Sequence, residues 1–224
     1  MKWFVAILLL LVAAVAALPF LSRDEGPPTT AVTGLPWQID VLPGERTRVF
    51  GLVLGESTLG DARRRLGPEL QVGIIAAGGE TGALEAYHGR YTAGVITGKL
   101  VLGTALAPPR IEAMKRRAAK REPTATGAWR YLLAPPDLEQ AWETPVQHLT
   151  FIPTVQLQPQ IIRRRFGEPA ARVPAPAEGE REHWLYPDLG LDLIFDPDGR
   201  EVLQYVLPRD FARLRRPLAD PATR

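Results

Sequence analysis

The sequence predicts an α+β protein with two similar modules, each a short helix packed on an antiparallel β-meander. A helical insert joins the modules, and an N-terminal transmembrane helix precedes them. Three observations predict this class: an uncharged run near the amino terminus, a motif that recurs after 100 residues, and 20 glycines with 22 prolines among 224 residues. So much glycine and proline favours short elements and many turns over a bundle of long helices.

The composition excludes several classes of function. Apolar residues make up 46% and charged residues 23%, which is typical of a globular chain and not of a disordered one. The chain has no cysteine, so disulfides, thiolate nucleophiles, cysteine-bound metals and a cysteine-linked lipid are excluded. The net charge of +2 gives no reason to expect a nucleic-acid partner.

Residues 1–22 are interpreted as a membrane anchor or a signal sequence. The run 3–20 carries no charge and would span about 27 Å as a helix, close to one bilayer core. A signal peptide cleaved before Ala17 is the alternative, but the run is longer than a usual signal core. We therefore expect a single-pass inner-membrane protein with its C-terminal domain in the periplasm or another extracytoplasmic space. Residues 23–47, rich in Pro, Thr and Gly, are predicted to form a tether.

The module prediction depends on a repeated motif. Residues 63–67 read RRRLG, and residues 163–167 read RRRFG. In each copy an apolar strand is expected to precede a helix of about two turns, with arginines toward water and a glycine in left-handed geometry at its end. The predicted modules cover residues 48–107 and 148–208.

Strands are predicted downstream of each helix. In the second copy, an Asp-Pro-Asp-Gly turn at 196–199 is expected to join two of them into a hairpin. The first copy has comparable apolar segments with less regular turns. The predicted strands are 84–87 and 95–102 in the first copy, and 183–186, 189–195 and 201–206 in the second.

This order of strand, short helix, Leu-Gly-x-Pro stop and meander resembles the small modules of the BamE (SmpA/OmlA) and beta-lactamase-inhibitor-like families. The resemblance covers residues 48–104 and 148–208. It implies an envelope protein that binds other proteins and has no catalytic residues. BamE-type proteins carry a lipidated cysteine, which this chain lacks, so neither outer-membrane lipidation nor any site residue carries over.

The insert 108–147 has a basic character. Residues 110–122 are predicted to form a helix rich in arginine and lysine, and the tail 209–224 is also basic. The insert helix could contact an acidic partner or anionic headgroups, although a solvated surface is the alternative. The candidate contact residues are Lys115, Arg116, Arg117, Lys120 and Arg121.

No motif in the sequence indicates catalysis. His88, His148 and His183 lack metal-ligand spacing and are interpreted as partly exposed strand residues. Asp196 and Asp198 fit a hairpin turn better than a calcium loop. The sequence has no complete phosphate loop and no serine elbow. We therefore expect no catalytic residues, no metal and no cofactor.

Together these observations predict a non-enzymatic envelope module that binds a protein partner, with no nucleic acid and no small-molecule cofactor. Two alternatives remain. One is a cell-wall hydrolase that uses carboxylates, and the other is an accessory subunit of a membrane protein complex. Two convergent carboxylates in a cleft would favour the hydrolase, whereas an open sheet surface would favour binding.

Overall fold

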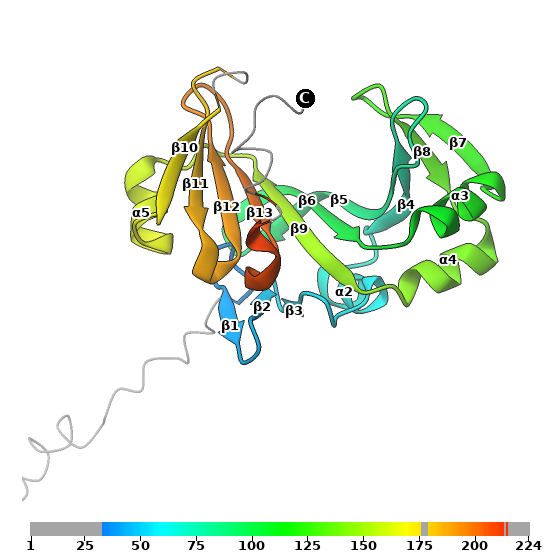
Figure 1. Ribbon diagram of the computed structural model, residues 1–224, viewed down its shortest axis with the longest axis horizontal. Helices are drawn as coiled ribbons and strands as arrows, with labels where there is room; N and C mark the ends of the chain where they lie inside the picture. The colour runs from blue at the N-terminus through cyan, green and yellow to red at the C-terminus, as the bar shows by residue number, and fades with distance from the viewer. Residues whose placement is uncertain (1–32, 176–178, 213, 215–224) are drawn as a thin grey trace, which may run out of the picture. The chain divides into compact units, whose positions relative to one another are not determined.

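Ten strands of the computed structural model form a single antiparallel sheet (Figure 1). The structure describes residues 33–175, 179–212 and 214. In their order across the sheet, the strands are β10 (Ala171–Pro174), β11 (Glu182–Tyr186), β12 (Leu191–Phe195), β13 (Val202–Tyr205), β9 (Val146–Pro153), β6 (Ile96–Thr104), β5 (Ala83–Ala93), β4 (Gln71–Ala76), β8 (Trp129–Leu132) and β7 (Lys120–Pro123).

A second, three-stranded sheet precedes the large one. It consists of β1 (Asp40–Leu42), β2 (Arg46–Val49) and β3 (Leu52–Val53). The sequence predicted one strand across this region, but the chain turns back sharply at Phe50 and Gly51, whose φ values are 52° and 78°.

Phe50 is fully buried despite its unusual backbone conformation. Its ring lies 5.4–5.9 Å from the rings of Tyr91, Phe151 and Tyr205. Burying a large aromatic side chain contributes about 1.5–3 kcal/mol, which offsets a left-handed conformation that costs about 1–3 kcal/mol. The aromatic cluster therefore holds the turn in place.

Within the described residues, four α-helices cover one side of the large sheet. Each places at least one buried side chain in the same apolar core, which also contains the inward residues of the strands. Figure 1 shows α5 beside β10 and β11, and shows α3 and α4 close to β7 and β8. The helices are α2 (Leu59–Leu66), α3 (Pro108–Arg116), α4 (Pro135–Trp142) and α5 (Pro159–Phe166), with 3-10 turns η2 (Pro187–Leu189) and η3 (Pro208–Asp210).

The predicted fold class is wrong. Strands make up 40% and helices 24% of the structure, so the protein is mainly β, with one continuous sheet in place of two separate meanders. The cause is β9, which pairs with β6 on one side and with β13 on the other. The insert also adds to the sheet, because its strands β7 and β8 extend the edge next to β4.

The predicted transmembrane helix at residues 1–22 lies outside the described residues. None of the helices within 33–175, 179–212 and 214 has the length and apolar character needed to span a bilayer.

The two arginine-rich helices end as the repeat predicted, with a difference in geometry. Gly67 and Gly167 follow α2 and α5, and each donates its N–H to the carbonyl four residues earlier. Their φ values of 108° and 84° are positive, but ψ is 166° and −171°. Both glycines therefore occupy an extended region open almost only to glycine, not the left-handed helical region that we expected.

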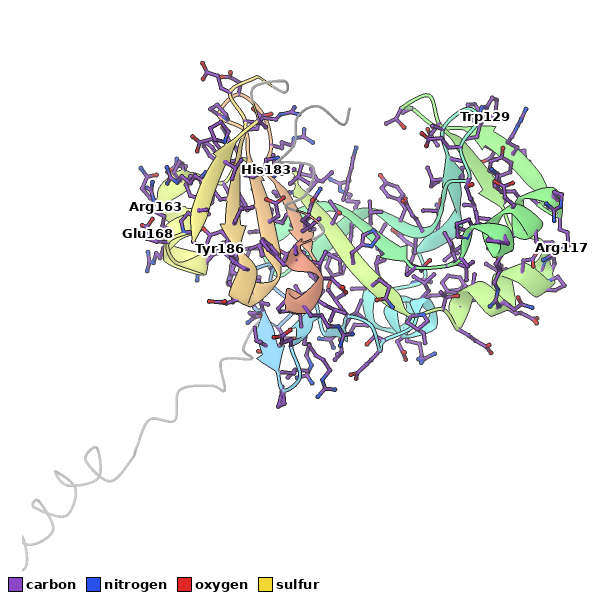
Figure 2. All side chains as sticks on the ribbon, viewed as in Figure 1. Arg117, Trp129, Arg163, Glu168, His183 and Tyr186 are labelled. Carbon is purple, nitrogen blue, oxygen red and sulfur yellow. The ribbon has the colours of Figure 1, made fainter. Side chains whose placement is uncertain are left out.

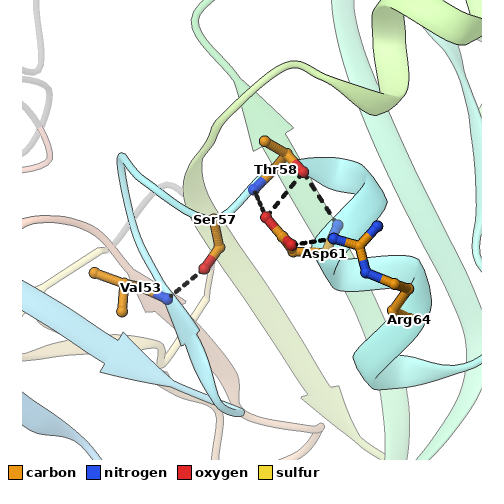
Figure 3. A network of polar contacts seen from close by, with 5 residues as sticks. All are labelled: Val53, Ser57, Thr58, Asp61 and Arg64. Carbon is orange, nitrogen blue, oxygen red and sulfur yellow. Dashed lines mark hydrogen bonds and ion pairs between the residues drawn. The ribbon is translucent and has the colours of Figure 1, made fainter.

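The start of α2 is fixed by a reciprocal pair of hydrogen bonds (Figure 3). Asp61 N donates to Thr58 Oγ1 at 3.1 Å, and Thr58 N donates to Asp61 Oδ2 at 2.8 Å. Arg64 also contacts the Asp61 carboxylate, and Val53 N donates to Ser57 Oγ at 3.0 Å. The capping box fixes the first turn of the helix, and the Val53–Ser57 bond ties the end of β3 to the residue before the cap.

The predicted basic helix 110–122 is shorter in the structure. Helix α3 ends at Arg116, and Lys120–Pro123 forms β7, which pairs with β8. Strand pairing overrides helix propensity here, because Ala119 N already donates to Leu132 O and starts the ladder.

Candidate binding face on the open side of the sheet

Strand alternation defines a second side of the sheet, opposite the helices. Leu84, Ala86, Leu100 and Leu102 face the core and are fully buried. The residues between them on β5 and β6 therefore point to the other side. We call this side the open face.

Cross-strand register arranges the open face in rows. Glu85, Gly103 and His148 are neighbours in one row across β5, β6 and β9. The next row holds Tyr87, Val101, Thr150 and Gln204, and a third holds Lys99 and Ile152. Polar and apolar groups are thus brought together from strands that are far apart in sequence.

The open face is hollowed in the half of the sheet that ends with β8 and β7. A cavity of about 560 Å³ lies over β4, β5, β6 and β9, a volume within the range of ligand pockets. Its lining combines apolar groups with three charged residues. The lining residues are Gln71, Gly73, Ile75, Glu85, Tyr87, Lys99, Val101, Pro123, Thr124, Ala125, Thr126, Arg130 and Ile152.

Glu85 is the one carboxylate among the described residues that line this cavity. It is half-buried, and within the described part of the chain it makes no hydrogen bond or ion pair. Burial raises the pKa of Glu85 above its ordinary value, because desolvation disfavours the charged form. A positively charged group entering the cavity would reverse that effect.

The other charged residues of the cavity differ in their pairing. The Arg130 guanidinium already contacts Gln71 Oε1 at 2.6 Å and the Glu122 carboxylate at 2.8 Å. Lys99 is exposed and has no ion pair within the described residues. The cavity therefore holds one carboxylate and one ammonium group that are both available to a ligand.

Tyr87 supplies an apolar surface between these charges. Its side chain is 40% exposed, although it lies in the middle of a strand and in the same row as Val101. An exposed aromatic ring in a hollow is typical of a contact residue at a protein interface. The open face thus shows negative, apolar and positive groups in successive rows.

The absence of a side chain at Gly103 lets His148 on β9 pack directly against β6. A β-carbon at this position would lie 1.9 Å from His148 Nε2, so the imidazole rests directly on the glycine. Partial burial at this position lowers the pKa of His148, because desolvation disfavours the imidazolium ion. His148 is thus part of the open face and not an isolated strand residue.

The chain returns to the open face after β13. A second cavity of about 390 Å³ is lined by Asp210 and Leu214 together with His148, Thr150 and Gln204. Phe211 is buried, although it does not belong to the core beneath the helices. Leu214, the last described residue, therefore lies on the open face beside residues of β9 and β13.

A buried His–Asp pair lies farther along the open face, in the half that Figure 2 marks with His183. His183 Nδ1 lies 2.8 Å from Asp192 Oδ2, and both side chains are buried. His183 Nε2 and Asp192 Oδ1 have no partner in the described structure. Ser57, the one serine among the described residues, lies beside β3, so this pair has no serine nucleophile within reach.

The histidines do not behave as the sequence indicated. His183 and His88 are both buried, contrary to the expectation of partial exposure. They also lie on opposite sides of the sheet, since His88 faces the core and contacts the Tyr91 ring. The described residues contain no group of three or more side chains arranged to hold a metal ion.

The predicted basic contact residues are mostly engaged within the fold. Lys115 donates to the Glu80 and Thr81 carbonyls and to Glu112, and its side chain is only 13% exposed. Arg116 is exposed on α3. Lys115 and Arg116 belong to α3, whereas Lys120 and Arg121 belong to β7. None of the five predicted contact residues lines the cavity of about 560 Å³.

The remaining three basic residues have specific partners. Arg117 forms two hydrogen bonds with the buried Asp137 carboxylate, at 2.6 and 3.1 Å. Lys120 pairs with Glu122 at 2.9 Å, and the Arg121 guanidinium lies 4.1 Å from the centre of the Trp129 ring. The Arg117–Asp137 pair is structural, because removing the arginine would leave a buried carboxylate without a partner.

Comparisons with known proteins found no relative of this chain. No family model matches the chain, and neither the curated proteins nor the solved structures yield a match.

Sequence reasoning missed Glu85, Tyr87 and Lys99. The sequence does contain a pattern that points to these residues. Glu85 and Lys99 each stand between apolar residues of a strand, at an alternate position. Such alternation indicates a strand with one side open to solvent.

Proposed function

We propose that this protein is a non-enzymatic binding module of the cell envelope and that it recognises a protein partner through the open face. The observation that carries the proposal is the hollow over β4, β5, β6 and β9, where exposed Tyr87 lies between Glu85 and Lys99. An aromatic residue flanked by charged groups without partners fits recognition better than catalysis.

The location in the envelope follows from the sequence. The uncharged run 3–20 supports attachment to the inner membrane, with the remainder of the chain on the periplasmic side. The later part of the predicted tether 23–47 belongs to the folded part, because β1 and the start of β2 lie within it. The accessory-subunit alternative fits the same arrangement.

The cavity favours binding over the hydrolase alternative. Acid–base hydrolysis of a polymer calls for two convergent carboxylates, and Glu85 alone provides one among the described lining residues. The basic residues near α3 remain a second proposed contact, for a partner or for anionic headgroups. Arg116 is the most informative of them, because its replacement breaks no buried pair.

The test is site-specific photo-crosslinking in native membranes. A photoreactive residue in place of Tyr87 should give a discrete crosslinked species, and Lys99→Glu should weaken it. The control places the same residue at Val41, which is 49% exposed on β1 and lies outside the open face. Identical patterns from both positions, or no product from position 87, would reject the proposal.

A further inference from the structure

The two arginine triplets of the repeated motif lie on α2 and α5, at residues 63–65 and 163–165. In the view of Figure 1, the three-stranded sheet β1–β3 lies between these two helices. Arg65, Arg164 and Arg165 are exposed and form no ion pair within the described residues. They therefore differ from the basic residues of the insert, most of which have partners in the fold.

Both triplets reach the start of the described chain. The Arg165 guanidinium lies 4.5 Å from the centre of the Trp37 ring. Arg65 is close enough to Tyr91 to act on its pKa, which burial raises and the positive charge lowers. The Tyr91 hydroxyl would lie 3.7 Å from a β-carbon at Gly34. Two arginines from helices 100 residues apart in the sequence thus lie beside the first residues of the folded part.

Hydrogen bonds hold the start of the folded part in place. The buried Tyr205 hydroxyl donates to Pro36 O at 2.9 Å, and Gln38 N donates to Leu35 O at 3.0 Å. The point at which the chain enters the fold is therefore fixed beside the arginines.

Chain connectivity limits how far this point can be from a membrane. Residues 23–32 separate the proposed anchor from Thr33, and ten residues span at most about 35 Å when fully extended. The arginines beside the chain start are thus kept near the bilayer that holds the anchor. Each basic residue near an anionic lipid surface strengthens binding about five-fold.

The exposed side of α5 combines charge with apolar surface. Ile161 is 40% exposed and lies one helical turn before Arg164 and Arg165, so the three side chains share one side of the helix. Trp37 lies next to Arg165. Arginines beside tryptophan and an exposed aliphatic residue are typical of a surface at the membrane–water interface.

We propose that Trp37, Arg65, Ile161, Arg164 and Arg165 form a face that lies against the anionic lipid headgroups of the membrane to which the chain is attached. We call it the arginine face. This inference rests on the membrane attachment in the proposed function and not on recognition by the open face. Because α2 and α5 cover the side of the sheet opposite the open face, the contact leaves the open face accessible to a partner.

Lipid nanodiscs that hold the complete 224-residue chain test the contact. The chain has no cysteine, so a fluorophore can be attached at one chosen position. A fluorophore on Ile161→Cys should be quenched by a nitroxide carried on lipid headgroups. The quenching should fall when phosphatidylglycerol in the nanodisc is replaced by phosphatidylcholine, because the anionic charge is then lost.

The control for this measurement is Gly78→Cys. Gly78 is an open position in the turn before β5, and a β-carbon there meets no atom within 4 Å. The turn lies at the opposite end of β5 from Tyr91, and the eight residues from Ala83 to Tyr91 span about 26 Å. Equal quenching at positions 161 and 78 would overturn the proposal.

Charge removal gives an independent readout. Arg164→Gln should lower the ratio of docked to undocked molecules about five-fold, and adding Arg65→Gln should bring the loss to roughly 25-fold. High salt should mimic the double substitution. The matched control is Arg116→Gln, at an exposed arginine of α3, which should leave the ratio unchanged. A loss with Arg116→Gln equal to that with Arg164→Gln, or no loss with either, counts against the proposal.

Flotation separates this inference from the proposed function. The complete chain should float with phosphatidylcholine vesicles in high salt through its anchor alone, and failure to float would reject the proposed membrane attachment. Even then, flotation with phosphatidylglycerol vesicles at low salt that the double substitution abolishes would support the arginine face, and its absence would overturn it. Loss of partner crosslinks from position 87, with quenching at 161 retained, would reject recognition by the open face and keep the lipid contact.

Discussion

Helices α2 and α5 share a length of eight residues, three successive arginines and a glycine stop, yet they begin differently. Helix α2 starts with the Thr58–Asp61 capping box, whereas α5 starts at Gln158 without a side-chain cap. Helix α2 also buries three residues and α5 only Ile162. The shared motif thus ends both helices in the same way. It does not fix how each helix begins or how many of its side chains are buried.

The largest expected effect is on core packing. Leu59→Ala in α2 and Ile162→Ala in α5 should each lower the free energy of unfolding by about 2–5 kcal/mol, because both side chains are fully buried. Chemical denaturation measures the loss. Ile161→Ala, at a neighbouring position that is 40% exposed, serves as the control and should cost far less. A similar cost at 161 and 162 would show that α5 packs through a different side.

Next in size is the loss at the two helix stops. Alanine at Gly67 or Gly167 should cost about 1–3 kcal/mol, because both residues adopt backbone conformations that a β-carbon disfavours. Neither added β-carbon meets an atom within 4 Å, so the cost is conformational. Gly78→Ala, at an equally open glycine without positive φ, is the control. Unchanged melting temperatures for both variants would contradict the observed helix ends.

A smaller loss is expected at the cap of α2. Thr58→Ala should cost about 1 kcal/mol, since it removes the acceptor for Asp61 N. Gln158→Ala, at the matching position of α5, should change the unfolding free energy by less, because that side chain makes no cap. Equal losses in the two variants would mean that the capping box contributes nothing.

The reverse change should give a modest gain. Gln158 has the extended backbone of an N-cap residue, with φ −64° and ψ 144°. Gln158→Asp should therefore stabilise the protein by about 0.5–1 kcal/mol through new bonds to the first helical turn. Differential scanning calorimetry checks the increase. A fall in melting temperature would show that position 158 is held by other contacts.

The smallest effect concerns pH. The hydrogen bond from the Thr58 backbone is the main cause that holds the pKa of Asp61 below its ordinary value. A lowered pKa contributes stability above the unfolded-state value, and this is lost as pH falls through the folded-state value. The stability advantage of the native chain over Asp61→Asn should thus shrink below about pH 4. Denaturation curves at pH 7 and pH 3 measure it; a constant difference would contradict this account.

Local patterns in the sequence were sufficient to predict several elements. The glycine stops of α2 and α5 and the turn at 196–199 between β12 and β13 all depend on neighbouring residues. The end of α3 at Arg116 was not predictable in this way, because pairing with β8 decides it.

The continuity of the sheet lay beyond local reasoning. Strand β9 pairs with β6 and β13, which come from distant parts of the chain. The same register decides that Glu85 and Lys99 share one side with His148. Alternation indicates that a strand has two sides, but only long-range pairing shows which residues of other strands become neighbours.

The double pairing of β9 has a consequence for synthesis. A ribosome releases β9 well before β13, so an emerging chain carries an eight-residue strand with one edge unpaired. Such an edge is a template for joining other chains. Because β13 closes it only after residue 205, nascent molecules crowded on one messenger are exposed to edge-to-edge association until that strand has been added.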